Sequence, residues 1–206
     1  MSGPGLAVPA GRAGRLWLDR RLVAARRGVD LLDRKLRILQ VELAARQETA
    51  AQAEREWHDR SASADRALLI AALLGGQRAI RLAAGSGWAE VTIGYAVTIG
   101  VRHPAHGQLV PPAGPDPWAG QPAELARQAH RAALDAAIRQ AVAAEAVRIL
   151  AEEVATTRYR LRALRDRLIP ALEQARAEVA LAIDEQERAD GARLRLAGGP
   201  AARQRR

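Results

Sequence analysis

The chain has 206 residues, a formal net charge of +9 and no cysteine. The absence of cysteine excludes disulfides, thiolate metal sites and a cysteine nucleophile. Aromatic residues make up only 3% of the chain and Phe is absent. Because compact cores usually draw much of their buried area from aromatic side chains, the composition favours long helices with aliphatic seams.

Residues 1–12 are rich in Gly and Pro and contain no apolar stretch of the kind found in a signal peptide. We therefore expect a flexible N-terminus and a cytoplasmic location.

Residues 13–84 are predicted to form one long helix. Apolar and small residues recur in steps of three and four, beginning with Leu18, Leu22, Ala25 and Val29. Such spacing is typical of a coiled-coil seam that needs a partner helix. We expect Gly75-Gly76 to kink the helix and Gly85 to end it.

Residues 85–121 are predicted to form a small insert. Residues 89–93 and 96–101 look like two short strands, so a hairpin with its turn near Gly94 is expected, followed by a Pro/Gly-rich loop. Residues 82–101 are long enough to span a membrane. Their alternating β-branched residues indicate strand instead.

Residues 122–196 are predicted to form the second long helix, with Pro122 first and Glu124 in its first turn. The heptad seam contains a stutter at Leu164-Leu168-Leu172, beside Pro170, where the helix should bend. We expect residues 198–200 to end this helix and residues 197–206 to form a basic, disordered tail.

The predicted fold class is all-α: a long antiparallel two-helix coiled coil with a small β-hairpin and loop insert between the helices. If the two arms match in length, Leu43 should lie near Leu164. Arms of about 70 residues would reach on the order of 100 Å.

The sequence offers no convincing catalytic, cofactor-binding or metal site. His103 and His106, with Asp116 as a third ligand, form a weak metal candidate, and we interpret them as exposed loop histidines. Glu152-Glu153 and the acidic residues 185 and 187 lack a pocket that could separate their pKa values, so we interpret them as surface ion-pairing groups. We therefore expect no enzyme activity and no cofactor.

Nucleic-acid binding, or a role as a basic coiled-coil scaffold, stays open as the alternative function. Arg residues cluster in pairs such as Arg20-Arg21 and Arg26-Arg27, and Lys35 lies in a third basic group. Acids are interspersed and no aromatic residues are interleaved for base stacking, which weakens the nucleic-acid interpretation.

Four segments resemble the D subunit of V-type and A-type rotary ATPases, and they occur in the order seen in that family. Residues 14–35 resemble its basic first helix, which ends in R-G-x-x-L-L-x-x-K, and residues 99–104 are similar to M-G-V-K/R-V-P. Residues 157–164 and 168–172 resemble T-R-R-R-V-N-A-L followed by L-I-P-x-L. Residues 184–190 are similar to E-R-E-R-E-D.

The resemblance implies a noncatalytic central-stalk subunit, a rotor shaft that couples ATP hydrolysis or synthesis to ion (proton) transport by rotation. Its implied partners are the A and B subunits of the catalytic ring, the small F subunit and the C-type (d) subunit, with no nucleic acid and no direct membrane insertion. The implied location is cytoplasmic, peripherally attached to the inner membrane through the complex. Both termini would lie in the ring and the insert at the opposite end, near the F and C-type subunits.

Overall fold

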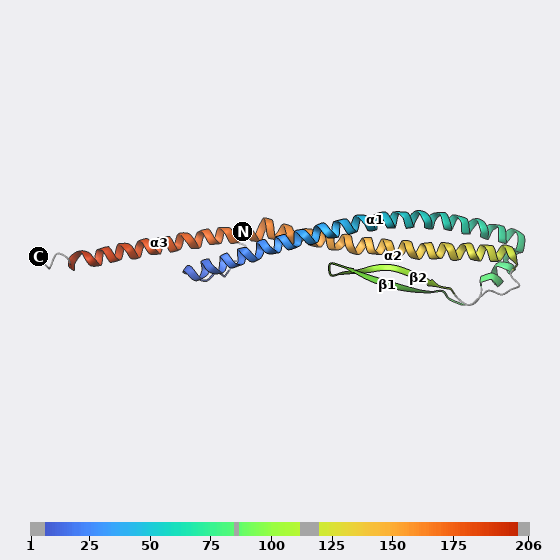
Figure 1. Ribbon diagram of the computed structural model, residues 1–206, viewed down its shortest axis with the longest axis horizontal. Coiled ribbons are helices and arrows are strands. Elements are labelled where there is room, and N and C mark those ends of the chain that lie inside the picture. Colours follow the sequence, from blue (N-terminus) through green and yellow to red (C-terminus); the bar gives the residue numbers. More distant parts are fainter. Residues whose placement is uncertain (1–6, 85–86, 112–119, 202–206) are drawn as a thin grey trace. The chain divides into compact units, whose positions relative to one another are not determined.

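The computed structural model describes residues 7–84, 87–111 and 120–201, and it is mostly helical (Figure 1). Its elements, in chain order, are α1 (Gly11–Ala84), β1 (Glu90–Thr98), β2 (Val101–Val110), α2 (Gln121–Ala163), the π-helical segment η2 (Leu164–Leu168) and α3 (Ile169–Ala201). Long helices with a small two-stranded antiparallel sheet between them confirm the predicted fold class.

The chain divides into two units. Residues 1–34 and 157–206 form the first, here called the terminal unit, and residues 35–156 form the second, here called the hairpin unit. Each unit contains part of α1 together with part of the C-terminal helical run, and only the hairpin unit contains the strands.

The core of the terminal unit is an aliphatic seam between α1 and α3. Leu18, Leu22, Ala25 and Leu172 are buried together, and Trp17 packs against them. The first three of these belong to the predicted seam of the first helix. Burying one leucine side chain contributes about 1.5–3 kcal/mol, so this small cluster supplies much of the attraction between the two helices here.

Ion pairs across the terminal unit show that its helices run antiparallel. Arg12 pairs with Glu187 at 2.7 Å, Asp19 with Arg176 at 2.6 Å, and Asp33 with Arg165 at 3.2 Å. As the residue number rises on α1, the number of its partner falls. All three pairs are substantially exposed, so each adds little to stability and mainly reports the register.

The hairpin unit has a second aliphatic seam. Leu39, Leu150 and Val154 are buried together, and Leu36, Leu43 and Val101 of β2 pack against them. The expectation that Leu43 lies near Leu164 is therefore wrong. Leu43 packs beside Leu150 and Val154, whereas in the terminal unit a methyl of Leu164 lies 3.7 Å from where a Cβ on Gly28 would be.

The pairing of the two arms differs from its prediction because the first arm contains more residues than the second along the length where they pack. Gly76 has non-helical backbone angles, φ 67° and ψ 177°, so α1 turns there, as predicted from Gly75-Gly76. Near the end of α1, Ala83 packs against Ala123 at the start of α2. The turn uses residues of α1 that have no counterpart on α2. Each seam residue of α1 therefore packs against a residue with a lower number on α2 than two arms of equal length would predict.

The hairpin is built differently from its prediction. The two predicted strands are one strand, β1, which passes straight through Gly94, and the second strand is β2, which starts at Val101. The turn lies at Ile99-Gly100, where both residues have positive φ, 45° and 77°. A two-residue turn with two positive φ values matches strand twist, whereas the Gly94-Tyr95 pair is continuous strand.

β2 occupies much of the region expected to be a Pro/Gly-rich loop. Gly94 lies opposite His106 and Tyr95 opposite Pro104, so Ala105 is the extra residue of a bulge in β2. Proline has no N–H for the ladder, and a bulge is one of the few places in a sheet that accepts it.

The C-terminal run begins as predicted but ends later. Glu124 lies in the first turn of α2, and its backbone N–H donates to the carbonyl of Gly120 at 3.1 Å. η2 coincides with the predicted stutter, and the Ile169 N–H donates to the Leu164 carbonyl. The prediction that residues 198–200 end the helix is wrong, since α3 continues to Ala201. Each glycine lowers helix propensity by about 1 kcal/mol and does not forbid the helix, and Pro200, the more costly residue, lies next to the last residue of α3.

Candidate interaction surfaces

The first surface lies on the α1 segment of the terminal unit, on residues outside its buried seam. Leu16, Val23 and Leu31 are 52%, 48% and 66% exposed. They recur at intervals of seven and eight residues, which places them on one side of the helix. A single helix that packs against one partner needs one such stripe, so a second, exposed stripe indicates a second partner.

Arginines alternate with these apolar residues. Arg20, Arg27 and Arg34 follow Leu16, Val23 and Leu31 by one helical turn, and all three are exposed. Within the part of the chain that the structure describes, none of the three forms an ion pair. We call these six residues the outer stripe of α1.

Other charges of the same segment are used inside the unit. Asp19 and Asp33 pair with Arg176 and Arg165, and Arg26 pairs with Glu173 at 2.8 Å. Asp19 and Asp33 are thus directed toward the partner arm, whereas Asp30 is exposed and lies between Arg27 and Arg34 on the same side of the helix. The three arginines of the outer stripe outnumber this one acid. This leaves the outer stripe cationic.

The second surface lies in the hairpin unit, just before the kink of α1. Leu69, Ile70, Leu73 and Leu74 are 61%, 54%, 78% and 72% exposed. Four large aliphatic side chains close together on the helix are unusual on a free surface and are typical of a protein–protein contact. An apolar cavity of about 240 Å³ lies on the same end of the unit, lined by Leu68, Ile80, Ala83, Ala123, Ala126, Arg127 and His130.

Polar contacts fix the start of α2 beside this surface. The Glu124 carboxylate accepts hydrogen bonds from Arg127, with Nε to Oε2 at 2.7 Å, and from Gln128 at 2.9 Å. The Arg127 hydrogen bonds, followed by the Gln128 bond, lower the pKa of Glu124 to about 2. The carboxylate is therefore charged near neutral pH, where it also suits the positive end of the helix.

The third surface is the hairpin. Alternate residues of β1, namely Val91, Ile93, Tyr95 and Val97, are 47%, 45%, 53% and 67% exposed. The guanidinium of Arg102 lies 4.0 Å from the centre of the Tyr95 ring. The hairpin therefore presents apolar side chains and a cation outward, although β-branched and aromatic residues usually face a core.

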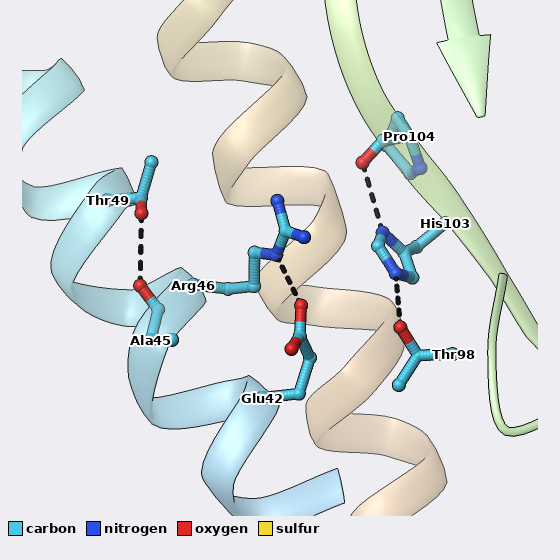
Figure 2. Close-up of polar contacts among 7 residues, drawn as sticks. All are labelled: Glu42, Ala45, Arg46, Thr49, Thr98, His103 and Pro104. Carbon is cyan, nitrogen blue, oxygen red and sulfur yellow. Dashed lines mark hydrogen bonds and ion pairs between the residues drawn. The ribbon is translucent and has the colours of Figure 1, made fainter. Parts of the chain in front are cut away.

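His103 has a different environment from the one expected. It lies in β2 and is completely buried, with Nε2 3.0 Å from the Thr98 hydroxyl and Nδ1 3.2 Å from the Pro104 carbonyl (Figure 2). A carbonyl oxygen can only accept, so Nδ1 donates. His106 also lies in β2, with its ring across Gly94. The interpretation of both residues as exposed loop histidines is wrong for His103, which is buried in a strand, and for His106 it is wrong about the loop, since His106 is exposed but lies in β2.

The predicted weak metal candidate finds no support. His103 uses both ring nitrogens within the hairpin, and Asp116 lies outside the described residues. Among residues that the structure describes, no group of His, Asp and Glu is arranged to hold a metal ion.

Three of the four acidic residues considered for acid–base chemistry form ion pairs, and Glu185 is exposed. Glu153 pairs with Lys35 at 2.6 Å and Glu152 with Arg148 at 3.3 Å, and Glu187 pairs with Arg12. Glu42 also forms the predicted pair with Arg46, at 2.7 Å (Figure 2). Carboxylates held by cations on open helix surfaces are structural in character.

No helix in the described part of the chain is long and apolar enough to cross a membrane. The segment considered as a span contains the end of α1 and all of β1.

Comparison with known families decides the assignment. A sequence model of the D-subunit family of ATP synthases matches residues 16–199. The chain belongs to this family. It is thus a D subunit of the V/A-type and part of a rotary ATPase. Among curated proteins, none matches the chain.

The four segments that resemble the D subunit lie on features described above. Residues 14–35 carry the outer stripe of α1, and residues 99–104 form the turn and the start of β2. Residues 157–172 contain η2, and residues 184–190 contain Glu187, which pairs with Arg12. His103, in the second of these segments, is fully buried and has a polar contact at each ring nitrogen.

The heptad count predicts that the arginines of the first helix lie outside its seam, but sequence reasoning missed the apolar residues of the outer stripe and the exposed quartet at residues 69–74. The apolar residues of the stripe could have been noticed in the sequence, because they recur at a spacing that places them on one side of a helix. The seam beside it has the same residue types, so only burial in the folded chain separates the two sets.

Proposed function

We propose that this D subunit is the noncatalytic rotor shaft, or central stalk, of its rotary ATPase. As a shaft it couples ATP hydrolysis or synthesis in the catalytic ring to ion transport, with the proton as the ion. Membership of the D-subunit family is the observation that carries the proposal. The protein performs no chemistry and acts through contacts that change with its angle.

The outer stripe of α1 supports contact with the ring of A and B subunits. Its apolar residues offer burial, and its arginines suit carboxylates on the ring. An asymmetric shaft binds each ring position differently, and that difference in binding free energy couples its angle to nucleotide affinity. Each exposed ion pair between the stripe and the ring would contribute only about 0–1 kcal/mol, because solvent screens it. These pairs can therefore break at every step of the rotation.

The exposed quartet at residues 69–74 and the hairpin support contacts with the F subunit and the C-type (d) subunit. Both surfaces belong to the hairpin unit, and both expose large apolar side chains. Through these subunits the shaft would be attached peripherally to the inner membrane from the cytoplasm.

Charge reversal in the outer stripe tests the proposal. We expect Arg27→Glu together with Arg34→Glu to weaken assembly with the ring, or to leave ATP hydrolysis while ATP-driven ion transport falls several-fold. The reason is that two cations without internal partners would be replaced by anions, which meet the ring carboxylates as like charges. The measurements are co-purification of the complex, ATP hydrolysis and ion transport in reconstituted vesicles.

The matched control is the exchange of Arg26→Glu with Glu173→Arg. It reverses charges on the same helix but keeps the pair and the net charge, so assembly and coupling should stay normal. Normal assembly and coupling in the Arg27/Arg34 variant would contradict the proposed contact.

A further inference from the structure

One edge of β1 has no partner strand. In the described residues, β1 pairs with β2 alone. Thr98 and Val101 flank the two-residue turn, and residues in that position exchange backbone hydrogen bonds. Alternation along the strand then directs the N–H and C=O groups of Val97 and Tyr95 away from β2. A row of unpaired groups of this kind is a template for another strand.

The side chains of this strand are also substantially exposed on one face. The exposed apolar row of β1 consists of Val91, Ile93, Tyr95 and Val97. An isolated two-stranded hairpin is only marginally stable in water, and a third strand is the usual remedy.

Charge divides the two ends of this edge. Arg102 lies opposite Val97, and its guanidinium stands over the ring of Tyr95, so its charge lies over β1 near the turn. Glu90, at the other end of β1, is exposed. Neither Arg102 nor Glu90 forms an ion pair within the described residues. The edge is therefore cationic near the turn and anionic at its far end.

The turn requires a positive φ at its first residue, but it does not require an isoleucine there. Ile99 has φ 45°, a region in which a β-branched residue is an outlier and which Asn or Gly occupies more easily. Its side chain is 42% exposed, so burial within the chain does not explain the choice. The isoleucine does, however, extend the apolar row to the tip of the hairpin, and strained positions of this kind concentrate at functional sites.

We propose that β1 accepts a third strand, contributed by another protein of the same complex. This added strand would carry apolar side chains at alternate positions, an acidic residue beside Arg102 and a basic residue beside Glu90. Main-chain hydrogen bonds would give affinity, and the apolar row with its two charges would set the register. The proposal rests on the proposed function, because the added strand belongs to the rotary complex.

Amide hydrogen exchange, compared between the isolated protein and the purified complex, tests this proposal. We expect the amides of Tyr95 and Val97 to exchange at least tenfold more slowly in the complex. Ala96 and Thr98, whose amides already face β2, should change much less. Equal exchange of Tyr95 and Val97 in the two samples would overturn the proposal, as would uniform slowing of the whole hairpin, which indicates covering without strand pairing.

Two variants separate edge pairing from side-chain contact. Val97→Pro removes the outward N–H but no bond to β2, and it should abolish the slow exchange at Tyr95. The control Val97→Thr keeps the N–H at residue 97, so Tyr95 should still exchange slowly in the complex. Arg102→Glu leaves the backbone intact and should accelerate exchange at Tyr95 in the complex, which keeps the test decisive if the proline variant does not fold.

The outcome distinguishes the two levels of inference. If the protein assembles and couples normally while the edge amides exchange freely, the third strand is wrong and the shaft function stands. If the protein enters no rotary complex, both proposals are wrong.

Discussion

At the scale of single residues, Thr157 is the clearest departure from ordinary packing. It is buried, and its hydroxyl has no hydrogen-bond partner among the described residues. A buried hydroxyl without a partner costs about 1–3 kcal/mol. The side chain therefore fills space in the seam at an energetic cost.

We expect Thr157→Val to raise the free energy of unfolding by about 1 kcal/mol, because valine has nearly the same shape and no polar atom to desolvate. The midpoint of chemical denaturation measures this change. Thr157→Ser, which keeps the hydroxyl and loses the methyl, should lower the midpoint. A valine variant no more stable than the natural chain would show that the hydroxyl is satisfied in solution.

Single residues also mark how far the sequence alone could lead. The arginine clusters were evident, but Arg26 and Arg27 are identical in sequence terms and differ in the fold. Arg26 pairs with Glu173, far away along the chain, whereas Arg27 has no such partner in the described residues. Long-range pairs depend on register, and the register could not be predicted without knowing how many residues the kink at Gly76 consumes.

At the scale of elements, the hairpin is held against α2 by a close backbone approach. A Cβ on Gly107 would lie 2.5 Å from a methyl of Ile138 and 3.1 Å from a methyl of Val142. Both neighbours are β-branched and stiff, so they cannot yield easily. Only glycine lets β2 come this near to the helix.

We expect Gly107→Leu to separate the hairpin from α2, since overpacking costs about 1–3 kcal/mol. Trypsin cleavage within the hairpin, followed by mass spectrometry, should then become roughly tenfold faster, as a loss of about 1.4 kcal/mol would give. Gln108→Ala, at the neighbouring position, is the control and should cleave at the natural rate. An unchanged rate in the Gly107 variant would show that the hairpin is not docked through this contact.

The helices were easier to predict than the hairpin for a physical reason. A heptad pattern over many turns leaves few alternatives, so α1 and the start of α2 agree with it. In the insert, the strand-like residues 89–101 contain two glycines at which a turn could lie. The turn was predicted at Gly94, but β1 continues through Gly94 and pairs with β2 on both sides of it, which outweighs a weak turn signal. The observed turn at Ile99-Gly100 was harder to predict, because isoleucine rarely adopts a positive φ.

At the scale of the whole molecule, the net charge of +9 raises the question of nucleic acid. Ion pairs leave this net excess unchanged, but they divide the basic surface, because Arg12, Arg26, Arg165 and Arg176 each lie beside a carboxylate of the other arm. Family membership and this pairing together favour a protein partner over a polyanion.

We expect only weak, salt-sensitive retention of the isolated protein on immobilised duplex DNA, with no sequence preference. Few phosphate contacts give a shallow dependence of affinity on salt, and binding should be lost near physiological ionic strength. A salt titration of retention on two unrelated DNA sequences measures this. Retention of one sequence above the other at physiological salt would favour the nucleic-acid alternative.

The pairing of Lys35 with Glu153 has a practical consequence. Lys35 is the only lysine in the sequence, and both partners are largely covered, at 26% side-chain exposure each. An amine-reactive probe can therefore modify just one side chain in the chain, apart from the terminal amine. Its labelling rate would report how often these helices separate at that point, without any engineered reporter group.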